Sequence, residues 1–215
     1  MNLNIFKKTL ITLILIFISC DFCISSEDVK NKETEYDSLL KRVKKLDKKV
    51  KFKDLRISFT KTANYKPYSV DENKQAMIKA FKSKQYEEAL KYAELVLDVN
   101  YVDIDTHLIC RAIYKELKKT KEYKFYDFMA NELINSILNS GDGLSSKTAY
   151  TVIYPREEEI VISKLGLKID KQSLIESDGH YYDKINVTKT EFAEESVIYF
   201  NVDIPLNWME EQLKK

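Results

Sequence analysis

The residues with the chemistry of acid–base catalysis stand in the second half of the chain. Asp142 could form a carboxylate pair with one of Glu157, Glu158 and Glu159, and His180 could serve as a further acid or base. That set of groups would suit a hydrolase. Each residue also has a structural interpretation: an aspartate can hold its own turn, glutamates favour the first turn of a helix, and a histidine after a hairpin turn is exposed.

No motif of a known catalytic or metal site accompanies these residues. The chain has no G-x-S-x-G, no H-E-x-x-H and no glycine-rich phosphate loop. His107 lies beside the apolar face of an expected helix, and the residue one turn later is Arg111, which is not a metal ligand. Cys110 falls among apolar residues and is expected to be a buried free cysteine. We therefore predict no catalytic residue, no metal site and no cofactor.

The charge balance argues against nucleic acid as a partner. The 215 residues include 35 Lys and Arg against 34 Asp and Glu, a net charge of +1. Hydrophobic residues make up 44% of the chain, which is enough for a core, and four glycines and three prolines leave little room for long flexible linkers.

Residues 1–20 have the organisation of an export signal. A pair of lysines precedes an apolar run of roughly ten residues, too short to cross a bilayer as a helix. The run ends in a serine followed by Cys20, which resembles a bacterial lipobox, so Cys20 is predicted to carry lipid and to anchor the chain to a membrane. Signal cleavage near Cys23 to Ser26, giving a soluble secreted protein, is the alternative. Residues 21–33 are predicted to be a polar tether.

Basic side chains follow the tether. Apolar residues recur at helical spacing over residues 36–50, and the opposite face carries lysine and arginine. This helix could touch anionic lipid beside the anchor, or it could bury its apolar stripe on the domain and leave its basic face in solvent. Residues 51–68 hold aromatic residues without a clean period, and Pro67 disfavours helix before it. We predict an extended strap that lies on the following helices.

Four helices are predicted over residues 73–138, and a β-rich half over residues 147–213. The helices span 73–81, 85–97, 103–117 and 121–138; their short connections favour antiparallel neighbours and resemble tetratricopeptide hairpins. The second half is expected to contain strands at 149–154, 171–176, 181–188 and 197–204, a helix from Pro155 to Gly166, and a closing helix at 207–213. Asp178-Gly179 is a strong hairpin signal. The fold class is therefore α+β, with residues 34–215 as one domain whose mainly antiparallel sheet packs on the helices.

The spacing of apolar residues changes from helical to strand-like at the turn formed by Ser140, Gly141, Asp142 and Gly143. Gly141 is expected to end the helix with a positive φ, and Asp142 to hold the turn by accepting bonds from backbone amides. Gly143 would let the chain reverse into the first strand. The rival interpretation makes Asp142 a calcium ligand, although no second acid lies within the loop.

Five segments together resemble a known bacterial family. They are Lys51-Phe52-Lys53-Asp54-Leu55-Arg56, Asn64-Tyr65-Lys66-Pro67-Tyr68, residues 136–143, Gln172-Ser173-Leu174 and Tyr199-Phe200-Asn201-Val202. Over residues 36–208 the chain resembles the family of exported proteins catalogued as domain of unknown function 4919. The resemblance implies an exported protein or lipoprotein and implies no activity.

The function expected from these observations is that of an exported, lipid-anchored envelope protein that binds or scaffolds a partner without catalysis. Its contacts would be the membrane, through the anchor, and a protein partner on the helical half. A hydrolase using carboxylates near the turn at residues 140–143 and a purely structural envelope protein are the alternatives. A binding module would expose an apolar groove, whereas an enzyme would have a deep pocket with converging polar groups.

Overall fold

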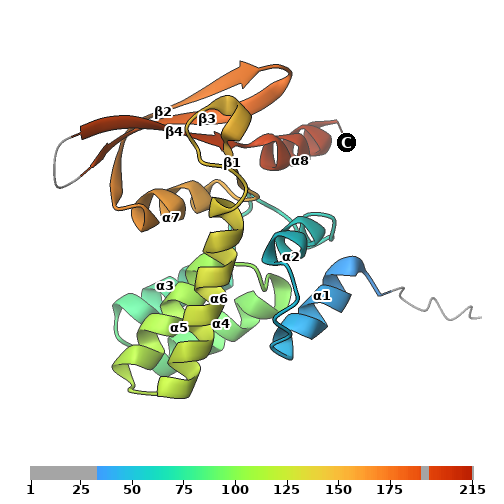
Figure 1. Cartoon of the computed structure of the whole chain (residues 1–215). Helices are drawn as coiled ribbons and strands as arrows, with labels where there is room; N and C mark the ends of the chain where they lie inside the picture. Colours follow the sequence, from blue (N-terminus) through green and yellow to red (C-terminus); the bar gives the residue numbers. More distant parts are fainter. Residues whose placement is uncertain (1–32, 190–193, 215) are drawn as a thin grey trace, which may run out of the picture. The chain divides into compact units, whose positions relative to one another are not determined.

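Eight α-helices, one short 3-10 helix and four strands make up the described part of the chain (Figure 1). The computed structural model describes residues 33–189 and 194–214, and Thr34–Lys215 forms one compact unit. Most of the helices precede the strands, and the strands form one sheet, so the predicted α+β class is confirmed. The predicted signal, Cys20 and nearly all of the predicted tether lie outside the described residues. Within the described ranges, no helix has the length and apolar character needed to span a membrane.

The first helix, α1 (Glu35–Lys44), is shorter than predicted. It begins with a capping box, in which the Thr34 hydroxyl accepts a hydrogen bond from the Asp37 amide at 3.1 Å and the Asp37 carboxylate accepts one from the Thr34 amide. The predicted continuation to residue 50 is wrong, because the chain turns at Leu46, which has φ 58°. The Asp47 carboxylate stabilises this turn by accepting a hydrogen bond from the Lys49 amide.

The predicted extended strap at residues 51–68 is also wrong in its first half, where α2 (Phe52–Phe59) forms. Phe52, Leu55, Arg56 and Phe59 are all buried and stand at positions i, i+3, i+4 and i+7. The spacing is that of a helix whose inner face contains one arginine. An arginine at an apolar position obscured the period.

Helices α3 (Glu72–Lys82), α4 (Tyr86–Val99), α5 (Ile104–Glu116) and α6 (Thr120–Leu138) confirm the four predicted helices. Two of them begin at aspartate caps: Asp71 accepts from the Lys74 amide at 3.0 Å, and Asp103 from the Thr106 amide at 2.8 Å. The closest pairs are α3 with α4 and α5 with α6. The likeness to tetratricopeptide hairpins stays a prediction.

The four strands form one mixed sheet in the order β1-β4-β3-β2. They are β1 (Tyr150–Thr151), β2 (Leu167–Ser177), β3 (His180–Lys189) and β4 (Glu194–Asn201). β3 pairs antiparallel with β2 and with β4, while β1 pairs parallel with β4. Asp178 and Gly179 have φ 54° and 77°, as a two-residue hairpin turn with two left-handed residues requires, so the predicted hairpin is confirmed.

Two predicted elements around the sheet differ in extent. The strand predicted at 149–154 stops at Thr151, because side chains take over the next backbone groups: the Ile153 amide donates to Glu157, and the Ile153 oxygen accepts from the Tyr65 hydroxyl. The final helix, α8 (Asp203–Leu213), begins four residues earlier than the predicted residue 207. Pro205 lies in its first turn, where a missing amide hydrogen is harmless.

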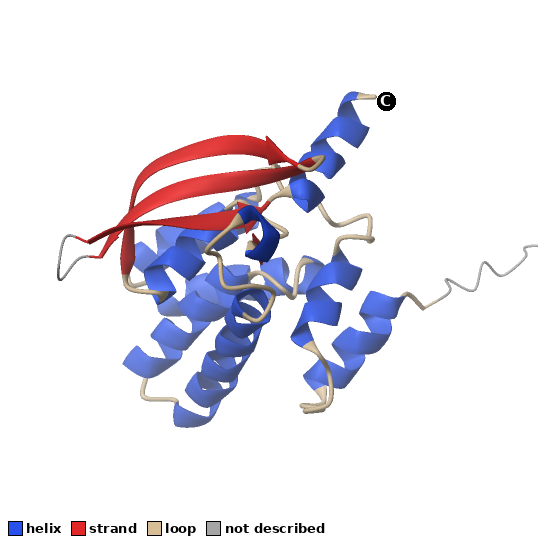
Figure 2. Ribbon diagram, turned by 45° about the horizontal axis from the view of Figure 1, so that its top comes forward, coloured by secondary structure: helices blue, strands red, loops and turns tan. Residues whose placement is uncertain are grey.

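The helical and β-rich halves share one hydrophobic core, which confirms that the sheet packs on the helices. Helix α7 (Arg156–Lys164), predicted to follow Pro155, contacts both β2 and α6. Phe59 from α2, Leu133 from α6, Ile185 from β3 and Phe200 from β4 are fully buried in the same cluster. Figure 2 shows the sheet on one side of the helices, with α7 beneath it.

Candidate functional site

The turn at residues 140–143 joins α6 to the sheet. The backbone oxygen of Thr148 accepts hydrogen bonds from the amides of Asp142 and Gly143, at 3.0 and 2.9 Å. The Asp142 carboxylate accepts from the Thr148 hydroxyl at 2.5 Å and from the Leu144 amide at 2.9 Å. Both bonds hold the pKa of Asp142 below its ordinary value, and the bond from the Thr148 hydroxyl has the larger effect. Asp142 therefore uses its carboxylate within the turn, as expected for a turn-holding residue.

The positive φ expected at Gly141 is wrong. Helix α6 is capped by Asn139, and the left-handed glycine of the turn is Gly143, with φ 72°. Gly141 is needed for space instead, because a Cβ there would lie 2.1 Å from the backbone oxygen of Thr148. Any side chain at this position would push the turn away from Thr148, the last residue of the 3-10 helix η1 (Ser146–Thr148).

A buried ion pair lies where α2, α6 and α7 meet. Arg56 on α2 and Glu157 on α7 are 1% and 3% exposed. The guanidinium donates from Nη2 to Oε2 of Glu157 at 2.5 Å and from Nε to Oε1 at 3.3 Å, which is a two-pronged contact. Nη1 also donates to the Ser136 hydroxyl at 3.3 Å, and the Ile153 amide donates to Glu157 at 2.8 Å. Glu157 is thus a structural partner of Arg56, not merely a charge at a helix start.

The next glutamate, Glu158, is also buried, and the charged side chains that act on it among the described residues, Asp183, Glu157 and Glu159, are all acidic. Residues 183, 185 and 187 of β3 share one face, and Gln172 stands opposite Ile185, so Gln172 and Asp183 both face α7. The Gln172 amide donates to Glu158 at 3.2 Å and to Asp183 at 2.9 Å. Oε1 of Glu158 is buried without a hydrogen-bond partner in the described part of the chain. Burial, reinforced by the neighbouring Asp183 carboxyl, raises the pKa of Glu158 from 4.5 to about 9.

The remaining members of the predicted catalytic set lie apart from this pair. Glu159 is exposed and forms an ion pair with Arg156 on the same helix. His180 is exposed, as expected, and its Nδ1 lies 2.7 Å from the Asp203 carboxylate. Asp142, Glu158 and His180 each have different hydrogen-bond partners, so the structure does not bring the predicted carboxylates and histidine to one point.

His107 and Cys110 are both buried on α5. Nε2 of His107 lies 2.8 Å from the Tyr101 backbone oxygen, and burial lowers the pKa of His107 to about 4. Cys110 is a free cysteine, as predicted. Within residues 33–189 and 194–214, no three His, Cys, Asp or Glu side chains are grouped in a way that could hold a metal ion.

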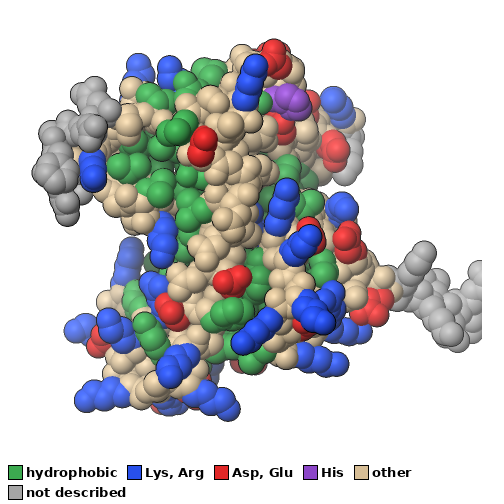
Figure 3. Space-filling model, in the orientation of Figure 1, with side chains coloured by type: hydrophobic (Ala, Val, Ile, Leu, Met, Phe, Trp, Pro, Cys, Tyr) green, Lys and Arg blue, Asp and Glu red, His purple; other side chains and the backbone are tan. Residues whose placement is uncertain are grey.

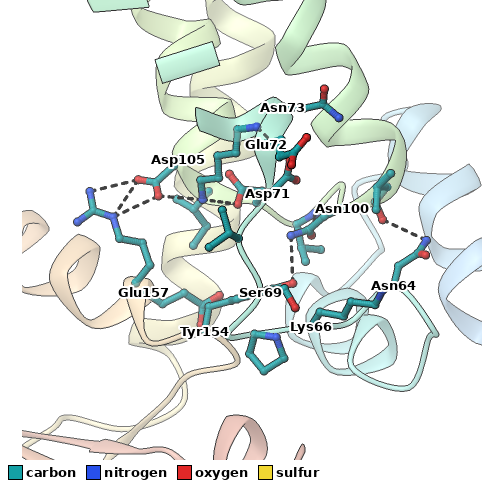
Figure 4. A pocket seen from close by; sticks show the side chains of 18 of the residues that line it. Asn64, Lys66, Ser69, Asp71, Glu72, Asn73, Asn100, Asp105, Tyr154 and Glu157 are labelled. Atoms are coloured by element: carbon teal, nitrogen blue, oxygen red, sulfur yellow. Dashed lines mark hydrogen bonds and ion pairs between the residues drawn. The ribbon is translucent and has the colours of Figure 1, made fainter. Parts of the chain in front are cut away.

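A polar cleft of about 510 Å³ opens between the segment 64–74, the start of α5 and the start of α7. Figure 4 shows the side chains around it. Its lining combines apolar side chains with polar and charged ones. The apolar residues are Pro67, Val70, Val99, Val102, Ile104 and Ile160, and the others are Asn64, Lys66, Ser69, Asp71, Glu72, Asn73, Lys74, Asn100, Asp103, Asp105, Tyr154, Arg156 and Glu157. Below the cleft, the Tyr154 ring lies 5.5 Å from that of Tyr65, so one wall rests on the aromatic core.

Two of the three cations of this polar cleft, Lys74 and Arg156, are paired with aspartates. Lys74 on α3 lies 2.6 Å from Asp103 and 3.1 Å from Asp105 on α5, and Asp105 also lies 3.2 Å from Arg156 on α7. Burial by itself would lower the pKa of Lys74, but attraction to the two aspartates outweighs it and raises the pKa. Lys74 therefore stays charged and is no amine nucleophile. The chain of ion pairs thus joins α3, α5 and α7.

Comparison with known families identifies the chain. Residues 24–211 match the model of the family described as Domain of unknown function (DUF4919). The chain belongs to this family. Searches of curated proteins and of solved structures give no significant match. Membership in DUF4919 confirms the resemblance seen in the sequence and carries no activity with it.

In this DUF4919 member, sequence reasoning missed the residues that organise the interior. Arg56 had one signal, its place in the i, i+3, i+4, i+7 pattern of Phe52, Leu55 and Phe59, which would have marked it as a buried charge in need of a partner. Lys74 and Tyr154 had none, because each acquires its role from residues distant in the sequence.

Proposed function

We propose that the chain is an exported, lipid-anchored protein of the bacterial cell envelope whose folded part binds a ligand in the polar cleft without transforming it. The cleft is the observation that carries the binding role. Its volume of about 510 Å³ is that of a small-molecule or oligomer subsite, and it combines one aromatic wall with several polar side chains.

The lining favours a polar, uncharged ligand. Lys74 and Arg156 are already paired with aspartates, so an anion would have to compete with Asp103 and Asp105. By contrast, the side chains of Asn73 and Ser69 make no hydrogen bond within the described residues. The Asn100 amide donates to the Tyr154 hydroxyl at 3.2 Å and its Oδ1 accepts from the Val102 amide at 3.2 Å, which leaves one of its amide hydrogens for a ligand. Amide and hydroxyl groups both donate and accept hydrogen bonds, which suits the hydroxyls of a glycan or the backbone of a neutral peptide.

Binding in the cleft is tested by nuclear magnetic resonance on the ¹⁵N-labelled full chain. Cell-wall glycan fragments and short neutral peptides are titrated separately, and the side-chain amide signals of Asn64, Asn73 and Asn100 are followed. One probe should shift these signals, and Asn100→Ala should weaken its binding. Asn207→Ala, which removes an exposed amide on α8, is the matched control and should bind normally.

Two results would contradict this proposal. Shifts confined to residues outside the cleft would place the ligand elsewhere. The appearance of cleaved probe in the spectra, proportional to protein and time, would replace the binding role by a hydrolytic one.

Export and anchoring are tested separately. The wild-type chain should incorporate radiolabelled fatty acid in a bacterial host, and Cys20→Ala should be unlabelled and released from the membrane fraction. Cys23→Ala is the control, because it removes the neighbouring cysteine and should leave labelling intact. Labelling of neither wild type nor control would contradict lipidation at Cys20.

A further inference from the structure

The three helix hairpins α1–α2, α3–α4 and α5–α6 turn through residues that are unusual at such positions. Leu46, Lys84 and Lys118 have φ of 58°, 60° and 55°. Each is the second residue after the end of α1, α3 or α5, where a left-handed conformation closes the helix and glycine or asparagine is the common choice. These positions retain long side chains in a conformation that disfavours them, which points to a use for the side chains in solvent.

Two of these connections also gather positive charge. Exposed lysines at 45, 48, 49 and 51 surround Leu46, and lysines at 115, 118, 119 and 121 surround the end of α5. The acidic residues among them are Asp47 and Glu116, and Asp47 is already paired with Arg42 at 2.9 Å. We call residues 44–51 and 115–121 the basic tips. At an overall net charge of +1, they concentrate charge that the rest of the chain offsets.

Both basic tips lie at the same end of the helices. The α1–α2 and α5–α6 connections are at the bottom in Figure 1 and again in Figure 2, away from the sheet. In the space-filling view, Lys and Arg side chains crowd the lower part of the molecule (Figure 3). The two basic tips therefore lie together at the end of the molecule that is away from the sheet (Figure 1 and Figure 2).

Each basic tip exposes an aliphatic side chain among its lysines. Leu46 is 54% exposed and Leu117 is 38% exposed. An exposed leucine at a loop tip surrounded by lysines suits an interface between water and lipid, where the aliphatic group enters the acyl region and the ammonium groups stay at the phosphates. A single-stranded nucleic acid is bound chiefly by stacking of its bases on aromatic rings or planar guanidinium groups, and the basic tips expose leucine instead.

We propose that the basic tips form a docking surface for an anionic phospholipid bilayer, which they contact through lysine ammonium groups and through Leu46 and Leu117. The contact orients the chain with its hairpin ends on the membrane and its sheet away from it. This surface acts independently of lipidation at Cys20.

The docking surface is tested by vesicle flotation of the full chain carrying Cys20→Ser, which prevents acylation. Vesicles of phosphatidylcholine alone are compared with vesicles that also contain phosphatidylglycerol. Every variant carries the same residues 1–33, so a difference between variants on the same vesicles reports the folded part. Wild type should prefer the anionic vesicles, and the preference should weaken as salt is raised.

Two variants separate the contributions of charge and of the leucine. Lys48→Gln with Lys49→Gln should lower partitioning to anionic vesicles on the order of 30-fold. Leu46→Asn should lower it on the order of 5-fold, and it should keep or raise the melting temperature, because asparagine tolerates the left-handed conformation. If Leu46 had only a structural role, Leu46→Asn would not lower vesicle binding while keeping the melting temperature.

The matched control is Lys168→Gln with Lys171→Gln, which makes the same charge change at exposed positions of β2 and should leave partitioning unchanged. If this control lost as much partitioning to anionic vesicles, the effect would depend on net charge alone, and the proposal would be overturned. Unchanged binding of Leu46→Asn would also overturn it, as would a wild type that binds oligonucleotides in preference to anionic vesicles.

Discussion

Replacing Glu158 with glutamine should remove a pH-dependent cost from the folded state. Glu158 is 2% exposed, faces Asp183 and Gln172, and has one carboxyl oxygen without a partner. Its other charged neighbours, Glu157 and Glu159, are also acidic. The carboxyl is therefore protonated at neutral pH, and glutamine copies the protonated form in shape and in neutrality.

The magnitude follows from the pKa of Glu158, which folding raises from 4.5 to about 9. Below 4.5 the group is protonated in both the folded and the unfolded chain, and the stability associated with the protonated form is fully present. As the pH rises from 4.5 towards 9, the unfolded chain ionises and the folded chain does not, so the free energy of unfolding falls by about 1.4 kcal/mol per pH unit. At pH 7 the wild type should have lost about 3 kcal/mol through this one group.

Urea unfolding of wild type and Glu158→Gln at several pH values between 4.5 and 9 measures this loss. The two proteins should have similar stability at the acidic end, and the variant should become more stable by about 1.4 kcal/mol for each pH unit above it. Glu159→Gln removes an exposed carboxylate from the same helix and controls for charge alone. A stability difference for Glu158→Gln that does not change with pH would refute a neutral Glu158.

Three further outcomes are expected. Arg56→Met should destabilise the chain by about 3–5 kcal/mol in urea unfolding, because Glu157 is left buried without its cation, and adding Glu157→Gln should recover most of the loss. Gly141→Ala should cost about 2–3 kcal/mol through overlap with a backbone oxygen, whereas Gly179→Ala, strained but unobstructed, should cost about 1 kcal/mol; equal costs would contradict the steric argument. Calcium and chelator should give the same melting temperature, and a calcium-dependent rise that disappears in Asp142→Asn would make Asp142 a ligand.

The two proposals, ligand binding in the polar cleft and bilayer docking by the basic tips, concern different parts of the molecule. The polar cleft lies at the starts of α3, α5 and α7, whereas the basic tips include the ends of α1 and α5. Because α5 runs from one to the other, docking of the tips on a bilayer would hold the cleft at about the length of that helix from the surface, which for 13 residues is about 20 Å.

Local sequence patterns determined much of the secondary structure. The four helices from α3 to α6 and the hairpin at Asp178-Gly179 were predictable because spacing of apolar residues, aspartate caps and a left-handed turn act within a few residues of one another. Family membership was likewise visible in short segments. The same local reasoning failed at α2, where one buried arginine broke the apolar pattern of Phe52, Leu55 and Phe59.

Only the tertiary structure decided what the charged residues do. Glu157, Glu158 and Glu159 are chemically identical neighbours, yet the first pairs with an arginine 101 residues away, the second is buried beside Asp183, and the third is exposed. Burial and the sign of the nearest charge determine whether a carboxyl is ionised, and both depend on residues brought together by packing. For the same reason the polar cleft emerged from the arrangement of helices, since its members are dispersed along the chain. The lysines of the basic tips are visible as two local runs, and the fold decided that the two runs lie at the same end of the helices (Figure 1).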